Sequence, residues 1–308
     1  AVRALPLMRT SVIPWLAREE INQVASGPEV FAMRKAIKVA SSGHGPIIVG
    51  PWLSEVGFEV LYWIPFLAWA TREFEIARER LIVVSRGGAH TWYLDFAEHH
   101  EDIFDLMSIK QFRKRNDARW KHGGNQKQMA PGAFDEFIIN AVKERRGLSQ
   151  VQVLHPSVMY RLLRYYWYEK GAISLLNKHT VYRPMPVTSG EALAKALPQE
   201  YVAVRFYFRP SFPDTSDNRE LVGQFIKRLS QRAPVVLLNT GLTVDDHRDF
   251  APDTGMGVHT VEHLMTPTTN LEVQSAIISR ARAFVGTYGG LSYLGPFYGV
   301  PTIGLFSN

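Results

Sequence analysis

The 308-residue sequence contains no cysteine. This absence excludes disulfide bridges, thiolate metal ligands and a cysteine nucleophile, and it fits a protein of a reducing compartment. No run of about 18 apolar residues is present, and the N-terminal stretch lacks the charged segment, apolar core and cleavage site of a secretory signal. The sequence therefore favours a soluble, cytoplasmic protein.

Three motifs for phosphates and cations are also missing. No G-x-G-x-x-G follows a predicted strand, which argues against a nicotinamide or flavin oxidoreductase. The P-loop pattern G-x-x-x-x-G-K-[ST] is absent, which excludes a P-loop enzyme at the level of the motif. No D-x-D triplet is available to hold a divalent cation beside a phosphate. We therefore expect neither a metal ion nor a bound cofactor.

The charge balance is moderately basic, with a formal net charge of +6 and a pI near 9.4. Such a charge suits an anionic membrane surface or a phosphate-bearing substrate, and it equally describes an ordinary solvated surface. We expect a small phosphate-bearing substrate and no nucleic acid. Two segments combine basic and aromatic residues, 110–121 and 160–170, and they indicate either peripheral contact with the inner face of a membrane or half-buried helix faces.

Strand and helix patterns alternate in the first half of the chain. Residues 1–45 read as an N-terminal helical extension that ends in a Ser/Gly-rich loop. Short apolar runs then predict strands, and amphipathic segments predict helices, the first of which Pro65 should kink or divide. The predicted strands are 46–51, 81–85 and 151–154, and the predicted helices are 55–72, 134–145 and 157–169.

The second half repeats this alternation after a Pro- and Gly-containing linker at 181–190. A helix is expected to begin near Asp217, because Glu220 follows at capping-box spacing. The predicted strands are 201–208, 234–238, 283–286 and 301–306, and the later helices are 271–281 and 291–298. This order predicts an α/β protein with two Rossmann-like domains, 46–186 and 187–308, each with a parallel sheet covered on both faces.

Ligands of such sheets bind beyond the carboxyl ends of the strands, so the loops there are the candidate sites. Gly289 and Gly290 follow a strand and precede a helix, where a phosphate can approach the backbone and the helix dipole. Thr287, Tyr288 and Ser292 lie in the same loop. A tight turn that uses its glycines for geometry alone explains the pattern equally well.

Other strand ends of the second half supply further candidates. Arg205 and Arg209 have the guanidinium groups that bind a diphosphate, although surface salt bridges to Asp214 or Asp217 would also explain them. Candidates for contact with a base or ribose follow the next strand, at Asn239, Thr240 and Gly241, although a plain turn explains these residues equally well.

The segment from 270–278 to 299–306 resembles the donor-binding part of GT-B glycosyltransferases, and it is most similar to the heptosyltransferase-type group. A helix, a strand, a Gly-containing loop, a helix and a Gly-x-Pro strand recur in that order over about 40 residues. Thr287 and Tyr288 stand where that group commonly has an acidic residue. The resemblance implies two domains facing each other across a cleft. It also implies sugar transfer from a nucleotide-sugar donor to a glycan or lipid-linked acceptor in polysaccharide biosynthesis, without a metal ion.

The resemblance places the acceptor at the loop after the first strand of the N-terminal domain. Glu55 is the first candidate there for the base that removes the acceptor proton, and Glu59 is the second. Either side chain is also explained as a first-turn acid that complements the helix dipole. His90, after the second strand, is an alternative base or acceptor ligand.

Other activities fit the same fold. A nucleotide-sugar epimerase or hydrolase remains an alternative, as does a non-catalytic protein that binds nucleotide or glycan in its cleft. Glu55, Glu59 or His90 facing the cleft opposite Gly289 would favour catalysis. GT-B chains usually close with a helix that returns to the first domain, whereas this sequence stops after a predicted strand. We therefore expect either further residues or a bracing role for the N-terminal extension.

Overall fold

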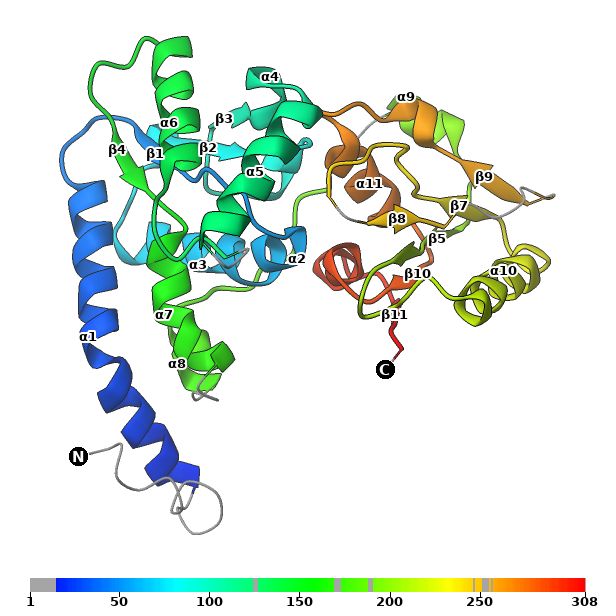
Figure 1. The fold of residues 1–308 in the computed structure, drawn as a ribbon, viewed down its shortest axis with the longest axis horizontal. Helices are drawn as coiled ribbons and strands as arrows, with labels where there is room; N and C mark the ends of the chain where they lie inside the picture. The colour runs from blue at the N-terminus through cyan, green and yellow to red at the C-terminus, as the bar shows by residue number, and fades with distance from the viewer. Residues whose placement is uncertain are drawn as a thin grey trace.

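The protein forms two α/β lobes, each built on its own parallel sheet (Figure 1). A computed structural model describes residues 15–123, 127–168, 173–187, 191–245, 247–250, 255 and 257–307. The predicted fold class, with two Rossmann-like parallel sheets, is confirmed, because no sheet among these residues spans both halves of the chain. Residues 1–14 of the expected N-terminal extension and 188–190 of the expected linker lie outside the described residues.

The N-terminal sheet has the strand order β3-β2-β1-β4, and every neighbouring pair is parallel. Its strands are β1 (Ile47–Val49), β2 (Leu81–Ser85), β3 (His99–Asp102) and β4 (Gln152–Leu154). Three of them match predicted strands. The fourth, β3, was not predicted, because its sequence His-His-Glu-Asp has none of the apolar character of a buried strand. It lies at the edge of the sheet, where two of its residues are exposed.

Alternating side chains of these strands pack into two hydrophobic cores, one on each face of the sheet, because successive residues of a strand point to opposite faces. Val49 and Val83 pack on one side, and Ile48 and Ile82 pack on the other. The helices of this lobe are α1 (Trp15–Ser41), α2 (Val56–Phe58), α3 (Ile64–Glu73), α4 (Ile103–Leu106), α5 (Ile109–Gly123), α6 (Ala133–Arg145), α7 (Ser157–Tyr168) and α8 (Ile173–Lys178).

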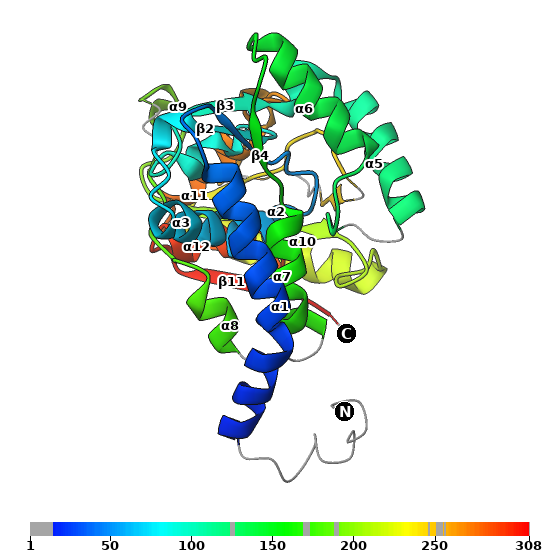
Figure 2. The ribbon, with the colours of Figure 1, turned by 90° about the vertical axis from the view of Figure 1, so that its left-hand side faces the viewer.

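Helix α1 packs against the N-terminal lobe and runs beside α7 (Figure 2). Met33 and Ile37 of α1 are buried in the same core as Leu162 and Leu163 of α7. The described part of the expected extension therefore belongs to this lobe. The basic-aromatic segment at 160–170 includes these buried leucines, so a half-buried helix face accounts for its apolar residues.

The C-terminal sheet has the order β11-β10-β5-β7-β9, again with parallel neighbours. Its strands are β5 (Val202–Arg205), β7 (Val235–Leu237), β9 (Val258–Thr260), β10 (Ala283–Thr287) and β11 (Thr302–Leu305). The predicted strand 201–208 is divided. After Phe206 the chain leaves the sheet and forms β6 (Tyr207–Phe208), which pairs antiparallel with β8 (Arg248–Asp249).

The helices of the C-terminal lobe are α9 (Glu191–Ala196), α10 (Ser216–Ser230), α11 (Asn270–Ile278) and α12 (Leu294–Phe297). Thr215 caps α10, accepting a hydrogen bond from the Asn218 N–H at 3.2 Å, so this helix begins slightly before the expected Asp217. The expected helix 291–298 consists of a 3₁₀ turn, Gly290–Tyr293, followed by the four residues of α12.

Pro65 lies in the first turn of α3, where a proline is tolerated because its nitrogen needs no partner there. The segment before it, Glu59–Trp63, is a π-helical turn. This turn directs Glu59 into the protein interior, where the side chain is fully buried. Ser85 and Tyr93 both donate hydrogen bonds to Glu59 Oε1 at 2.6 Å. Burial raises the pKa of Glu59 to about 7, against the lowering influence of the nearby Arg86 charge and of these two hydrogen bonds.

The loop after β2 joins the two lobes. The Gly87 carbonyl accepts a hydrogen bond from the Leu271 N–H at 2.7 Å, at the start of α11. Trp92 Nε1 donates to Ser275 Oγ at 2.8 Å, one helical turn further along α11. Gly88 adopts a left-handed φ of +80°, and a Cβ there would lie 2.8 Å from Glu272 Cβ. The lobes therefore meet at a point that only glycine fits.

Replacing Gly88 by alanine tests this contact. The new methyl group must displace α11 as well as accept a strained φ, so Gly88→Ala should destabilise the protein by about 1–3 kcal/mol more than Gly147→Ala. Gly147 is the matched control, because it has a similar φ of +63° with nothing within 4 Å of a Cβ. Urea unfolding of both variants measures the difference. Equal losses of stability would mean that the lobes do not depend on this contact.

Glu59 predicts a pH dependence of stability. Its pKa is higher in the folded protein than the ordinary value of 4.5, so the folded state holds the proton more tightly and stability falls as pH rises from about 4.5 to 7. The wild type should therefore lose about 3 kcal/mol relative to Glu59→Gln across this window, because glutamine does not ionise. Denaturant unfolding of both proteins at pH 5, 6, 7 and 8 provides the comparison. A difference that stays constant over this range would show that Glu59 is already ionised at pH 5.

Candidate functional site

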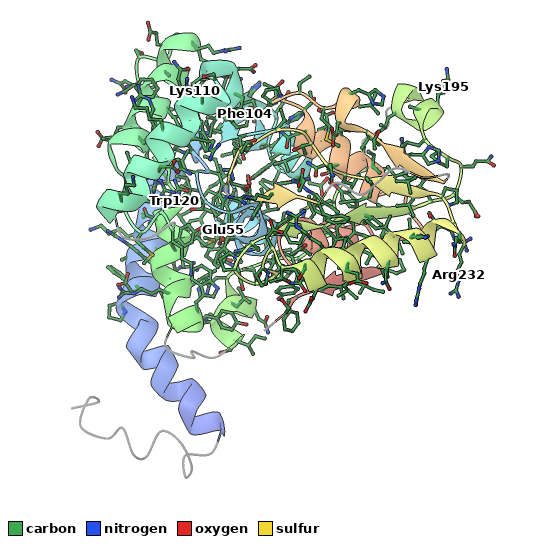
Figure 3. All side chains as sticks on the ribbon, turned by 45° about the vertical axis from the view of Figure 1, so that its right-hand side comes forward. Glu55, Phe104, Lys110, Trp120, Lys195 and Arg232 are labelled. Carbon is green, nitrogen blue, oxygen red and sulfur yellow. The ribbon has the colours of Figure 1, made fainter. Side chains whose placement is uncertain are left out.

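A cleft of about 530 Å³ lies between the two lobes. The loops at the carboxyl ends of strands from both sheets surround it, which is where ligands of open α/β sheets bind. Figure 3 shows Glu55 at the meeting point of the lobes, whereas Lys195 and Arg232 lie at the far side of the C-terminal lobe. Seven of the predicted site residues line the cleft: Glu55, Arg205, Arg209, Thr240, Tyr288, Gly289 and Gly290.

The loop after β1 forms the N-terminal wall of the cleft. Glu55 immediately precedes α2, in extended backbone conformation, and its side chain is 37% exposed. Arg86 holds this loop from beneath, because its guanidinium group donates to the Trp52 carbonyl at 3.2 Å and to the Ser54 carbonyl at 2.8 Å. The buried arginine thus fixes the backbone on both sides of Leu53, immediately before Glu55.

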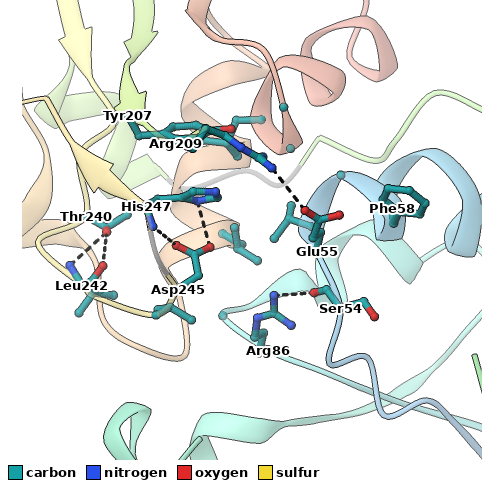
Figure 4. Close-up of a pocket in the computed structure, with 18 of the residues that line it drawn as sticks. Ser54, Glu55, Phe58, Arg86, Tyr207, Arg209, Thr240, Leu242, Asp245 and His247 are labelled. Atoms are coloured by element: carbon teal, nitrogen blue, oxygen red, sulfur yellow. Dashed lines mark hydrogen bonds and ion pairs between the residues drawn. The ribbon is translucent and has the colours of Figure 1, made fainter. Parts of the chain in front are cut away.

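An ion pair crosses the cleft (Figure 4). Arg209 Nη2 of the C-terminal lobe lies 3.5 Å from Glu55 Oε1 of the N-terminal lobe. The Arg209 Nε atom is buried and makes no hydrogen bond to any residue that the structure describes. Arg209 therefore uses only part of its hydrogen-bonding capacity, and its carboxylate partner Glu55 is about a third exposed.

Arg205 lies deeper in the same wall and is more fully paired. It donates to Asp249 Oδ1 from Nε at 3.2 Å and from Nη2 at 3.0 Å, and to Gln274 Oε1 from Nη1 at 2.5 Å. The alternative explanation, a salt bridge to Asp214 or Asp217, does not describe it. Asp214 instead pairs with Arg219 on the surface.

The glycine loop differs from the expected helix N-terminus. Gly289 has a φ of +155°, and a Cβ there would collide with the Tyr207 hydroxyl. The Gly289 N–H donates to Ser292 Oγ at 3.1 Å, and the helix that follows is only four residues long. Gly290 packs against Val56 of the other lobe. The two glycines therefore allow close packing against Tyr207 and Val56. Because the helix that follows is short, its dipole at this position is small.

The remaining predicted donor residues do not line the cleft. Thr287 is buried and exchanges hydrogen bonds with the Tyr207 backbone at 3.0 and 2.9 Å. Asn239 is buried and donates to the Phe250 carbonyl at 2.8 Å. Gly241 and Ser292 also lie outside the cleft lining. These residues support the loops that carry the lining side chains.

Two of the three candidate bases also lie outside the cleft. Glu59 is enclosed in the core of the N-terminal lobe. His90 stacks on His100 with 4.0 Å between ring centroids, beside β3 in a separate small pocket. Burial lowers the pKa of His90. Glu55 alone of the three shares the cleft with Gly289, and this is the arrangement that favours catalysis over binding alone.

Sequence reasoning missed one wall of the cleft, a face of α5. Phe112, Asn116 and Trp120 recur at intervals of four residues and line the cleft together with Arg113 and Asp117. This spacing places the side chains on one face of a helix, which was a signal available in the sequence. Part of the basic segment at 110–121 therefore lines the cleft.

Sequence reasoning also missed the loop between β7 and β8. Tyr207, Asp245 and His247 line the cleft beside Arg209 (Figure 4). Asp245 and His247 come from an irregular loop that carries no recognisable motif. Their approach to Tyr207 depends on the pairing of β8 with β6, which sequence patterns do not reveal.

Within the described parts of the chain, no group of three or more His, Asp or Glu side chains has the geometry to hold a metal ion. None of the described helices combines the length and the apolar character that crossing a membrane requires.

No protein-family model matches the chain, and no curated protein sequence matches it. Among solved structures, it is similar to a glycosyl transferase family 9 protein from Veillonella parvula, with 11% identity, a TM-score of 0.47 and coverage of 85% of this chain and 80% of the other. For the E. coli ADP-heptose lps heptosyltransferase II, the identity is 12%, the TM-score 0.47 and the coverage 85% of both chains. For the E. coli heptosyltransferase WaaC with ADP-2-deoxy-2-fluoro heptose, the identity is 14% and the TM-score is 0.41, with coverage of 83% of this chain and 87% of the other. These proteins belong to the group that the C-terminal segment resembles. With TM-scores below 0.5, the likeness carries no argument about chemistry, which rests on the cleft itself.

Proposed function

We propose that the protein is a glycosyltransferase that moves a sugar from a nucleotide-activated donor to the hydroxyl group of a glycan or lipid-linked acceptor. The observation that carries this proposal is the pair of opposite groups across the cleft. Glu55 is a partly exposed carboxylate on the N-terminal lobe, and Arg209 is a cation on the C-terminal lobe, 3.5 Å away. Glycosyl transfer needs a base for the acceptor and positive charge for the leaving group, on opposite sides of the reacting carbon.

The C-terminal wall suits the donor diphosphate. Arg209 lines the cleft with a side chain that is 30% exposed, and a guanidinium group binds phosphate oxygens with two parallel hydrogen bonds. Arg205 adds a second positive charge behind Tyr207, held in place by Asp249 and Gln274. Because these arginines can neutralise the charge that develops on the leaving group, we propose that transfer needs no divalent metal ion.

The N-terminal wall suits the acceptor. In transfer with inversion, Glu55 takes the proton of the acceptor hydroxyl, and the acceptor oxygen forms a bond to the anomeric carbon. The bond from that carbon to the diphosphate breaks, and the nucleoside diphosphate departs with the bonding electrons. Trp120 of α5 offers aromatic surface on the same wall for a sugar ring, and Arg113 offers a positive charge.

The ion pair between the lobes links the two halves of the reaction. A diphosphate carries more negative charge than one carboxylate, so it should displace Glu55 from Arg209. Glu55 is then released from Arg209 and can accept a hydrogen bond from the acceptor hydroxyl. Donor binding thus prepares the base.

Variants of the two paired residues test the proposal by calorimetric titration with ADP, UDP and GDP. Arg209→Met should weaken binding of the preferred nucleotide by roughly 10- to 150-fold, the range for a lost hydrogen bond to a charged group. Glu55→Gln should bind that nucleotide at least as tightly as the wild type, because it removes the competitor for Arg209. Its release of nucleoside diphosphate from the corresponding nucleotide sugar should nevertheless fall by about 100-fold or more.

Arg219→Met is the control, because it removes a positive charge from the same lobe at a surface pair with Asp214. It should bind nucleotides like the wild type. The proposal is wrong if the wild type binds none of the three nucleotides, or if Arg209→Met and Arg219→Met behave alike. Gly289→Val is not a clean test, because its side chain would displace Tyr207 whether or not a nucleotide is present.

A further inference from the structure

A second ion pair lies in the cleft, within one loop of the C-terminal lobe. His247 Nδ1 lies 3.0 Å from Asp245 Oδ2, and the His247 backbone N–H donates to Asp245 Oδ1 at 3.0 Å. One carboxylate therefore holds both the ring and the backbone of the same histidine. This double contact fixes the orientation of the imidazole, and it requires that Nδ1 carry the proton.

The histidine lies one ring away from Arg209. Its imidazole packs against the Tyr207 ring with 4.2 Å between ring centroids and an angle of 34° between the ring planes. The Tyr207 hydroxyl reaches the Gly289 backbone, and the Arg209 guanidinium lies beside the same glycine. His247, Tyr207 and Arg209 therefore form adjacent layers of one wall, and the imidazole edge points toward the middle of the cleft (Figure 4). No residue that the structure describes makes a hydrogen bond to Nε2.

The charges around His247 come from several elements. Arg205 of β5 forms an ion pair with Asp249 of β8 behind Tyr207. In front of Tyr207, Arg209 forms an ion pair with Glu55. Burial alone would raise the pKa of Asp245, but the hydrogen bonds and positive charge of His247, with a smaller contribution from Arg205, lower it overall. The carboxylate is therefore ionised and accepts hydrogen bonds from the ring and the backbone of His247.

We propose that His247 binds the diphosphate of the nucleotide through an Nε2–H hydrogen bond, and that Asp245 is the positioning residue that holds the imidazole in this orientation. The inference rests on the proposed function and assigns it a further ligand for the leaving group. A protonated imidazole suits this position, because its charge opposes the negative charge of the diphosphate. Asp245 also lines the cleft, and its pairing with His247 offsets the negative charge that would otherwise repel a phosphate.

A base for the acceptor is the other role that a histidine paired with a carboxylate can have. The position argues against it here, since His247 lies on the wall of Arg205 and Arg209 and the loop of Glu55 forms the opposite wall. A base would leave the affinity for a nucleoside diphosphate unchanged when it is replaced, and a diphosphate ligand would not. Binding of the nucleotide alone therefore separates the two roles.

Calorimetric titration with ADP, UDP and GDP at pH 6.0 and pH 8.5 tests the inference on the wild type, His247→Gln and Asp245→Asn. Histidines ordinarily lose their charge within this range. At pH 6.0, His247→Gln should bind the preferred nucleotide about 10-fold more weakly than the wild type, and at pH 8.5 the ratio should shrink to about 2-fold or less. Because the variant and the wild type are compared at the same pH, protonation of the nucleotide affects both affinities equally and does not change their ratio. Asp245→Asn should bind less tightly than the wild type at pH 6.0, because the carboxylate that holds both the ring and the backbone of His247 in this orientation is lost.

His263→Gln is the matched control, since it removes an exposed histidine from the same lobe away from the cleft, and it should match the wild type at both pH values. The inference is overturned if His247→Gln binds like the wild type, or if its loss of affinity is the same at both pH values, as a structural role would give. In both cases a loss of binding in Arg209→Met would leave the proposed function intact. If the wild type binds none of the nucleotides at either pH, the proposed function and the inference fail together.

Discussion

The contact between the Gly87-Gly88 turn and the start of α11 sets the geometry on which the site depends. The hydrogen bond from the Leu271 N–H to the Gly87 carbonyl is 2.7 Å long, and the Trp92–Ser275 hydrogen bond repeats the connection one turn later. This turn directly follows Arg86, whose guanidinium group holds the loop that carries Glu55. The same few residues therefore join the lobes and bring the Glu55 carboxylate opposite Arg209.

Two arginines and one histidine on the C-terminal side of the cleft each have a carboxylate partner. The Arg205–Asp249 pair and the Asp245–His247 pair lie within the C-terminal lobe, at 3.0 Å each, while the Arg209–Glu55 pair joins the two lobes at 3.5 Å. The pair between the lobes is the longest, and both of its side chains are about a third exposed. It is therefore the pair that the proposed diphosphate would open most easily. In the proposal, the other two pairs hold Arg205 and His247 in position while Arg209 exchanges its partner.

The strand pattern was predictable wherever burial on both faces imposes an apolar run, as in β1, β2 and β10. It was not predictable for β3, because an edge strand can be polar, or for the end of β5, because the turn into β6 follows from its pairing with β8. Glu55 and Arg209 could be identified because loops after strands are the expected ligand sites of such sheets. Their direct contact could not, since it depends on how the lobes dock.

Other site residues were beyond the reach of local patterns. The π-helical turn before Pro65 carries Glu59 inward, whereas a regular first turn of a helix would leave an acidic side chain in solvent. His247 lies 38 residues after Arg209 in the chain and reaches it only through the fold. Helical spacing along α5 was readable in the sequence, but nothing in it indicated that this face borders the cleft and not the core.

The most direct test of the account is a crystal structure of the protein with a bound nucleoside diphosphate, obtained with ADP, UDP or GDP according to which binds most tightly. The account predicts that the diphosphate lies within hydrogen-bonding distance of Arg209 and His247, and that Glu55 no longer contacts Arg209 and faces the open part of the cleft. A nucleotide bound outside the cleft, or one bound in it with the Arg209–Glu55 pair still closed, would contradict it.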